Sequence, residues 1–284
     1  MPELPEVETL VRGLRRSVVG RRVLEVRFGK TDFIDDAAAI ERGVPGCRIA
    51  AIERVGKFFL LRLESAAAEA NGRPPAALLV HLGMTGHLSP HRPEEPAPRH
   101  THVVMPLDDG HELRYTDPRR FGRMALLSGA ALQAEIARHG AEPLKIHENE
   151  FCTRLAARRA RVKALLLDQR FLHGIGNIYA DESLWHARIH PMRIAATLTR
   201  GQARALHRAI RKVLAAAIRA GGSSISDYRD ADGRPGFFQI RHRAYDREGK
   251  PCHRCRARIR RILVAGRSSH FCPRCQRVPR SKQA

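Results

Sequence analysis

Two pairs of cysteines near the C-terminus constrain the fold of this chain more than any other feature of its sequence. Cys252 and Cys255 form one Cys-x-x-Cys pair, Cys272 and Cys275 form the other, and sixteen residues separate the two pairs. Each pair offers two thiolates from one tight turn, and this spacing is typical of a tetrahedral four-thiolate zinc site. We therefore expect one structural Zn²⁺ holding a β-hairpin, because four thiolates leave no open position for a substrate.

The remaining cysteines and the neighbouring histidines stand outside this pattern. Cys47 and Cys152 are distant from the pairs in sequence, and we interpret them as ordinary buried thiols. His253 and His270 lie close to the pairs, but four thiolates already complete a tetrahedral site. The alternative of four unrelated buried cysteines fits the regular spacing poorly.

The charge of the chain indicates a polyanionic partner. Its 284 residues include 51 Lys and Arg against 29 Asp and Glu, which gives a formal net charge of +22. From Arg234 to Ala284 there are fifteen Lys or Arg residues and only two acids, Asp246 and Glu248. Such an excess is typical of nucleic-acid-binding proteins. No run approaches the ~20 apolar residues of a membrane span, so we expect a cytosolic protein with no membrane partner.

The apolar pattern predicts an α+β multidomain chain. Apolar residues at helical spacing after the start predict one helix, and short β-branched runs up to about residue 130 predict an antiparallel sandwich or barrel. Helical patterns follow, and we predict domains at 1–130, 131–233 and 234–284. The predicted strands are Val23–Phe28, Arg48–Val55, Phe58–Leu63, Ala76–Leu82, His102–Pro106, Glu112–Thr116 and Arg123–Leu127. The later predicted helices are Ala130–His139, Val162–Leu167, Ile178–His186 and Arg200–Ala220.

The amino terminus admits two interpretations. If Met1 is removed, Pro2 becomes a secondary amine beside the carboxylate of Glu3, and an α-amino group with a pKa near ~8 is partly an uncharged nucleophile at neutral pH. Attack on a sugar aldehyde carbon would give an iminium ion. Alternatively, Pro2 and Pro5 only mark the start of a helix whose first turn favours acidic residues.

Three further segments combine basic, aromatic or glycine residues in ways that suit nucleic acid. Lys57 precedes an apolar strand, and taken by itself it is best interpreted as an ordinary edge-strand charge. The turn Asp117–Gly122 places arginine beside phenylalanine, a pairing that suits insertion between bases, although the turn taken alone is best interpreted as structural. Gly174–Asn177 interrupts two helices and is either a plain connector or a phosphate-binding turn.

Taken together, these motifs resemble the formamidopyrimidine-DNA glycosylase family, whose members are also called 8-oxoguanine DNA glycosylase/AP lyases. Five matching segments occur in the family's order, and the resemblance covers essentially the whole chain. They are Met1–Thr9, His81–Gly86, Tyr115–Gly122, Gly174–Ala180 and the four-cysteine finger. The resemblance implies an N-terminal antiparallel β-sandwich with a flanking helix, a helix-two-turn-helix domain and a C-terminal zinc-finger β-hairpin.

The resemblance also implies the catalytic roles. Pro2 would attack C1′ of a flipped damaged nucleotide, with Glu3 as general acid and base. Lys57 matches the family's lysine that assists β-elimination, and Arg267 matches the arginine associated with δ-elimination. Once an iminium ion forms, the neighbouring sugar proton becomes acidic, so excision and strand cleavage share one intermediate.

The remaining matched positions concern DNA binding. Met84, Arg119 and Phe121 would fill the gap left by the flipped base. His100, Arg119 and Arg159 align with family DNA contacts, and Lys163 and Asn177 are further expected phosphate ligands. The segment Ala220–Tyr228 resembles the start of the loop that covers the flipped base, and its glycines suit a moving lid.

These matches predict a monomeric bacterial enzyme, cytoplasmic and nucleoid-associated, that excises oxidised purines from damaged double-stranded DNA and then nicks the strand. Two alternatives stay open. One is the sibling endonuclease VIII type, which prefers oxidised pyrimidines. The other is a catalytically silent DNA-binding zinc protein, which would bind DNA in a salt-dependent way without cleaving it.

Overall fold

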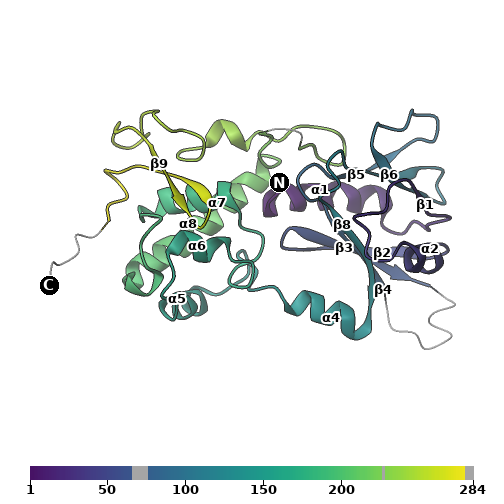
Figure 1. Cartoon of the computed structure of the whole chain (residues 1–284), viewed down its shortest axis with the longest axis horizontal. Coiled ribbons are helices and arrows are strands. Elements are labelled where there is room, and N and C mark those ends of the chain that lie inside the picture. Colours follow the sequence, from purple (N-terminus) through teal and green to yellow (C-terminus); the bar gives the residue numbers. More distant parts are fainter. Residues whose placement is uncertain (66–75, 226–227, 279–284) are drawn as a thin grey trace. The chain divides into compact units, whose positions relative to one another are not determined.

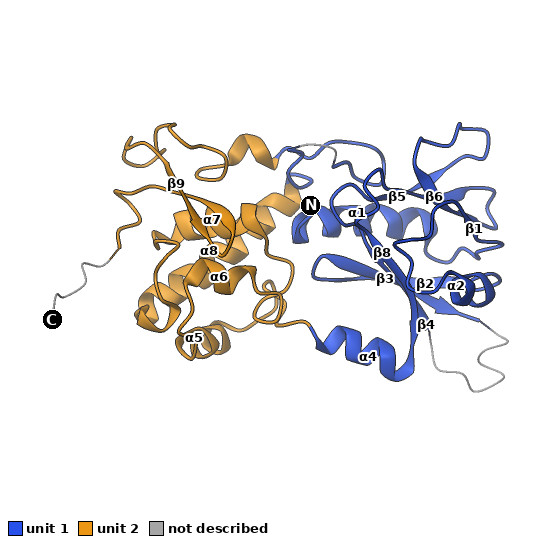
Figure 2. Cartoon of the chain, in the orientation of Figure 1, with its two compact units in different colours: residues 1–138, 220–237 blue, residues 139–219, 238–284 orange. Residues whose placement is uncertain are grey.

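The computed structural model describes residues 1–65, 76–225 and 228–278, which divide into two compact units (Figure 2). Unit 1 comprises Met1–Arg138 and Ala220–Phe237, and unit 2 comprises His139–Arg219 and Phe238–Ala284. The chain returns to unit 1 at residue 220, and in this returning segment the backbone N–H of Ser223 bonds to the side chain of Glu6.

Unit 1 contains helix α1 and two four-stranded antiparallel sheets (Figure 1). One sheet has the strand order β1-β6-β7-β5 and the other β2-β3-β4-β8. The strands are β1 Arg27–Phe28, β2 Arg48–Val55, β3 Phe58–Glu64, β4 Ala76–His81, β5 His87–His91, β6 Thr101–Pro106, β7 Glu112–Thr116 and β8 Arg123–Ser128. The helices are α1 Leu4–Val18, α2 Ala37–Gly43 and α4 Gly129–Ala137.

The apolar face of α1 fixes the amino terminus to the core of unit 1. This face has no exposed surface and packs in one cluster with residues from both sheets. Its members are Val7, Leu10, Val11, Leu14 and Val18. Full burial of one such side chain contributes about 1.5–3 kcal/mol, so α1 is held firmly and the residues before it have a defined position.

Strand β5 was not predicted, because Pro90 lies in it. Proline has no N–H to donate to a sheet ladder and is confined to edge strands and bulges. β5 is an edge strand that pairs only with β7, and there Pro90 lies opposite Leu113. Pro90 is therefore tolerated in β5 because this strand lies at the edge of the sheet.

Unit 2 is mainly helical and ends in a β-hairpin. Its helices are α5 Glu148–Ala156, α6 Val162–Leu167, α7 Asn177–Ala187 and α8 Arg200–Arg219, with short 3₁₀ turns η1 Ala195–Thr197 and η2 Phe238–Arg241. Between α6 and α7, the side-chain amide of Gln169 braces the turn by accepting from the N–H of Gly174 at 2.8 Å and donating to the carbonyl of Ile175 at 2.9 Å. Every residue of α7 from Ile178 to Trp185 is buried, so this helix is the centre of the unit.

The C-terminal hairpin pairs β9 Arg260–Val264 with β10 Arg267–Phe271 in antiparallel register. Ala265 and Gly266 join the strands, and both have positive φ, as a type I′ turn requires. Arg267 is therefore the first residue after the hairpin turn. The antiparallel sheets, the helical region and this hairpin confirm the predicted fold class. In the described part of the chain, no helix is long and apolar enough to cross a membrane.

Candidate active site

The start of α1 places the two residues that sequence reasoning put at the centre of the chemistry. Glu3 is the N-cap of α1 and is 3 % exposed, and Pro2 beside it is buried. Met1 covers this position and is half exposed. The backbone N–H of Glu3 donates to Oε2 of Glu6 at 2.9 Å, which fixes the first turn of the helix. Pro2 thus lies at a rigid and enclosed position.

Burial of the amino terminus favours an uncharged amine. The pKa of the Met1 amino group lies below its ordinary value of 8.0, mainly because burial penalises the ammonium form. Glu3 and Glu6 oppose this shift, whereas the positive charges of Lys57 and Arg119 lower the pKa further. Lys57 lies in the turn between β2 and β3. Unit 1 therefore brings the predicted nucleophile, acid and lysine into one electrostatic environment.

A buried carboxylate links the amino terminus to segment 220–237 of the same unit. Oε1 of Glu6 accepts from the N–H of Ser223 at 2.7 Å, and the hydroxyl of Tyr228 donates to the carbonyl of Glu6 at 2.9 Å. These contacts hold Ser223 and Tyr228 of the predicted lid segment Ala220–Tyr228 against the first turn of α1. Residues 226–227 of that segment lie outside the described residues.

The three predicted gap-filling residues are exposed in two neighbouring loops of unit 1. Met84 is 42 % exposed and Phe121 is 56 % exposed, which is unusual for large apolar side chains. The guanidinium of Arg119 lies over the ring of Phe121 at 4.5 Å from its centroid. A cation against an aromatic ring at this distance is an attractive contact. His100, the other predicted contact in unit 1, is exposed and has a φ of 68°.

Apart from the cysteines, unit 2 holds four predicted site residues, and it brings three of them together at the hairpin. The ammonium of Lys163 donates to the carbonyl of Ser268 at 2.6 Å, and the amide of Asn177 donates to the hydroxyl of Ser268 at 3.3 Å. Ser268 follows Arg267, whose side chain is exposed. Arg159 is exposed in the loop between α5 and α6.

Lys163 differs from its expected environment. We expected Lys163 to be a phosphate ligand. The Lys163 side chain has no exposed surface, however, and its ammonium lies 2.6 Å from a carboxylate oxygen of Asp181. Asp181 in turn accepts from the backbone N–H of His270 at 2.8 Å. Burying an ammonium is costly unless it is paired, so the pairing accounts for the position of Lys163. In this structure Lys163 acts within the protein and supports the hairpin.

The four paired cysteines form a cluster that suits a metal ion. The Sγ atoms of Cys252, Cys255, Cys272 and Cys275 all lie within 4.8 Å of one another, and all four cysteines are free thiols. Tetrahedral zinc with bonds of about 2.3 Å separates its sulfur ligands by about 3.8 Å, so the cluster fits such an ion.

Backbone amides support the sulfur atoms of this cluster. The N–H of Arg254 donates to Sγ of Cys252 at 3.5 Å, and the N–H of Cys275 donates to Sγ of Cys272 at 3.4 Å. Although burial opposes the thiolate, hydrogen bonds from the backbone N–H groups of Arg254 and Cys255 help to lower the pKa of Cys252 to about 6. His270 instead contacts Asp181, as expected for a residue outside the ligand set.

Comparison with known proteins assigns the family. The model of the formamidopyrimidine-DNA glycosylase N-terminal domain matches residues 1–124, that of its H2TH domain residues 140–229, and a zinc finger found in FPG and IleRS residues 249–278. A formamidopyrimidine-DNA glycosylase of Solibacter usitatus is 44 % identical over 279 residues, which cover 98 % of this chain and 100 % of the relative. The chain belongs to the formamidopyrimidine-DNA glycosylase family.

Further relatives and solved structures agree with this family. The formamidopyrimidine-DNA glycosylase of Chloroflexus aggregans is 46 % identical over 97 % of this chain and 98 % of the relative. The crystal structure of the MutM (Fpg) protein of Thermus thermophilus aligns with a TM-score of 0.83 at 43 % identity, over 97 % of this chain and 98 % of that one. A Lactococcus lactis Fpg mutant in complex with Fapy-dG-containing DNA aligns with a TM-score of 0.88 at 32 % identity, over 98 % and 100 %.

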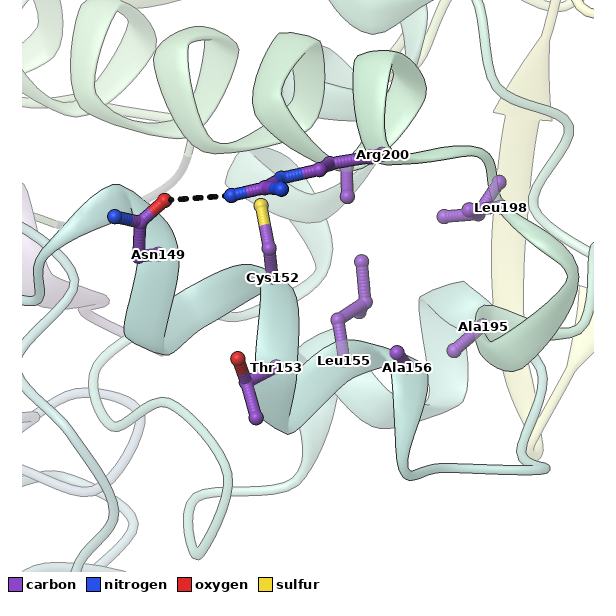
Figure 3. A pocket seen from close by; sticks show the side chains of 9 residues that line it. Asn149, Cys152, Thr153, Leu155, Ala156, Ala195, Leu198 and Arg200 are labelled. Carbon is purple, nitrogen blue, oxygen red and sulfur yellow. Dashed lines mark hydrogen bonds between the residues drawn. The ribbon is translucent and has the colours of Figure 1, made fainter.

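One pocket of this family member is lined by none of the predicted site residues. It has a volume of about 350 Å³ and is lined by side chains of α5, η1 and the start of α8 (Figure 3). Cys152 lines it near Arg200, whose guanidinium donates to Asn149 at 3.3 Å. Cys152 is therefore only partly buried, whereas Cys47 is buried as expected.

Sequence reasoning missed the buried acids that hold the site together. Glu6 was interpreted only as a favourable first-turn residue, and nothing local indicates its bond to Ser223. Asp117 gave no signal beyond its position in the matched segment Tyr115–Gly122, and Asp181 lies just after the matched segment Gly174–Ala180. The burial of Lys163 requires an acidic partner, but the sequence predicted Lys163 as a phosphate ligand and so did not point to Asp181.

Proposed function

We propose that this chain is a bifunctional DNA glycosylase/AP lyase of base excision repair that removes oxidised purines from duplex DNA. The observation that carries this proposal is the start of α1, where Pro2 and Glu3 are enclosed beside the charges of Lys57 and Arg119. A DNA-binding protein without chemistry has no need of a buried proline amine at such a place. The complexes of relatives with Fapy-dG DNA and with abasic-site DNA support the choice of substrate.

Pro2 is the nucleophile in this proposal, after Met1 has been removed. Its nitrogen forms a bond to C1′ while the bond from C1′ to the damaged base breaks, with Glu3 as general acid and base for the proton that leaves the amine. The C1′–O4′ bond then breaks and O4′ takes up a proton from Glu3, which opens the sugar ring and gives the iminium ion. This ion draws electrons from C2′. Loss of a C2′ proton then expels the 3′ phosphate, and a second elimination expels the 5′ phosphate, with Lys57 and Arg267 assisting.

The other predicted residues bind the distorted duplex. Met84, Arg119 and Phe121 occupy the space that the flipped base leaves, while His100, Arg159 and Asn177 contact phosphates. Lys163 contributes from inside unit 2 by holding the hairpin that carries Arg267. The formal charge of +22 supplies the sequence-independent part of DNA binding.

We assign one structural Zn²⁺ to Cys252, Cys255, Cys272 and Cys275, because four soft thiolates favour this ion and leave no open coordination position. We further propose three functional domains at about 1–130, 131–233 and 234–284, and a monomer that acts at the bacterial nucleoid in the cytoplasm. A single chain carries every residue that the mechanism requires.

Borohydride trapping on a duplex containing 8-oxoguanine tests this proposal, because reduction converts the iminium ion into a stable cross-link. Wild-type protein should cross-link, and Pro2→Gly should not. Glu3→Gln should lose base excision and keep binding. Efficient cross-linking by Pro2→Gly would rule out Pro2 as the nucleophile, and faster excision of thymine glycol than of 8-oxoguanine would favour the endonuclease VIII type.

A further inference from the structure

Asp117 is a buried carboxylate at the start of the turn between β7 and β8. It has no exposed surface. Its Oδ1 accepts from the hydroxyl of Thr85 at 2.6 Å and from the N–H of Arg119 at 3.2 Å. Its Oδ2 accepts from the N–H of Gly122 at 2.9 Å and from the hydroxyl of Tyr115 at 3.3 Å. Four donors thus converge on one side chain.

These bonds tie together the two loops that carry the exposed gap-filling residues. Thr85 follows Met84 in the first loop, and its hydroxyl also accepts from the N–H of Arg119 at 3.3 Å. Gly122 follows Phe121 in the second loop. Arg119 therefore bonds to Asp117 directly, and Met84 and Phe121 each stand next to a residue that does.

The backbones of the two loops approach so closely that side chains are excluded between them. A Cβ added to Gly83, which has a φ of 59°, would lie 2.3 Å from the carbonyl carbon of Phe121. A Cβ on Gly122 would lie 1.9 Å from the hydroxyl of Tyr115. Any side chain at Gly83 or Gly122 would therefore force the backbone of Phe121 or the hydroxyl of Tyr115 to move.

We infer that Asp117, acting through Thr85, is a positioning residue that holds Met84, Arg119 and Phe121 as one preformed wedge. Opening a base step in DNA costs a few kcal/mol, and any ordering of a mobile wedge would add to that cost. A preformed wedge avoids this addition. The inference rests on the proposed function, because the wedge matters only if a base is extruded from a duplex.

Thr85 offers a matched pair of variants that tests the network without touching the wedge side chains. Thr85→Val keeps the shape and removes the hydroxyl, whereas Thr85→Ser keeps the hydroxyl and removes the methyl group. Asp117→Asn is the second test, because its NH₂ group cannot accept from the Gly122 N–H. All variants are compared with wild-type protein from which Met1 has been removed.

Two substrates separate wedge positioning from general damage to the fold. The first is an 8-oxoguanine duplex with 2-aminopurine opposite the lesion, whose fluorescence rises when stacking is disrupted. The second is a single strand with a preformed abasic site, which has no stacked helix to open. Borohydride trapping on this strand reports the amine chemistry alone.

We expect Thr85→Val and Asp117→Asn to slow duplex excision at least tenfold and to reduce the 2-aminopurine signal, while trapping on the single strand stays within twofold of wild type. Thr85→Ser should stay within threefold in every assay. Equal losses on both substrates, unchanged duplex excision, or a Thr85→Ser variant as slow as Thr85→Val would each overturn the inference. If wild-type protein traps on neither substrate, the proposed function itself fails.

Discussion

The carboxylate of Glu6 accepts a hydrogen bond of 2.7 Å from the backbone N–H of Ser223, although 217 positions separate the two residues. Its other oxygen accepts from the N–H of Glu3 at 2.9 Å. The approach depends on Gly222, where a Cβ would lie 2.9 Å from Oε1 of Glu6 and where φ is 83°. One buried carboxylate therefore couples the catalytic end of α1 to the start of segment 220–237.

Replacing Glu6 by glutamine should break this coupling. The amide has one acceptor oxygen, so one of the two N–H donors loses its partner at a cost of about 1.5–3 kcal/mol. We expect that loss in the free energy of unfolding, measured with urea, and at least tenfold slower excision in a single turnover. Glu8→Gln is the matched control, because Glu8 lies on the same helix but pairs with Arg12 and Arg54. Wild-type excision by Glu6→Gln would contradict the coupling.

The pKa of the Met1 amino group should lie below that of an ordinary α-amino group, and the positive charge of Lys57 should contribute to this lowering. The positive charge of Lys57 lowers the pKa of the Met1 amine, so Lys57→Met should raise that pKa and reduce the uncharged fraction at pH 7. The rate at which an N-hydroxysuccinimide ester labels the untrimmed chain, followed by mass spectrometry across pH, measures the shift. Arg62→Met is the control, since Arg62 pairs with Glu53 instead. Identical pH profiles for Lys57→Met and wild type would disprove the contribution.

Local sequence patterns predicted the elements that bury many apolar residues. Predicted bounds for Arg48–Val55 and Val162–Leu167 match β2 and α6. Helices α2 and α5 were missed, because α2 buries only Ile40 and α5 only Phe151 and Leu155, too few to show a helical period.

Local motifs predicted the residues of the site but not the contacts that position them. Motifs located Pro2, the wedge residues and the cysteines, because each lies in a short run with recognisable chemistry. The contacts that hold them depend on partners far along the chain. Lys163 reaches Ser268, 105 positions away, and Glu6 reaches Ser223, so no local pattern could reveal either contact.

Trp185 should report metal occupancy of the cysteine cluster. It is the only tryptophan of the chain, packs in one cluster with Cys252 and Cys272, and has the guanidinium of Arg254 3.7 Å from its ring centroid. Removing the ion with a chelator should loosen this packing, shift the emission to longer wavelengths and weaken DNA binding at least tenfold, and added Zn²⁺ should reverse both changes. Cys152→Ser should respond as wild type does. Unchanged emission in protein shown to be metal-free would refute the link.

The buried pair of Lys163 and Asp181 should show strong non-additivity. Asp181→Asn leaves an ammonium without its charge partner, and Lys163→Met leaves a carboxylate without one, so each single change should cost about 3–5 kcal/mol of unfolding free energy. The double variant Lys163→Met/Asp181→Asn buries neither charge and should cost clearly less than the sum. Guanidinium unfolding of all four proteins measures the coupling. Additive losses would show that the two side chains act independently.

Glu182 should make the stability of unit 2 depend on pH. Burial, with a further contribution from Asp181, raises the pKa of its carboxyl from 4.5 to about 7, although the backbone N–H groups of Arg243, Ala244 and Tyr245 stabilise the charged form. Because the pKa of Glu182 is higher in the folded protein than in the unfolded one, its contribution to the free energy of unfolding is largest below pH 4.5, where the carboxyl is protonated in both states. That contribution falls by about 3 kcal/mol in total as the pH rises from 4.5 to about 7.

Glu182→Gln removes this titration and keeps an oxygen that can accept from the same backbone groups. We therefore expect the variant to lose less stability than wild type between pH 4.5 and 7, as measured by urea unfolding at a series of pH values. Glu248→Gln, in the loop before the cysteine cluster, is a control with an exposed carboxyl. If Glu182→Gln follows the wild-type curve throughout this range, Glu182 does not titrate there, and its carboxylate is accommodated by the three backbone donors alone.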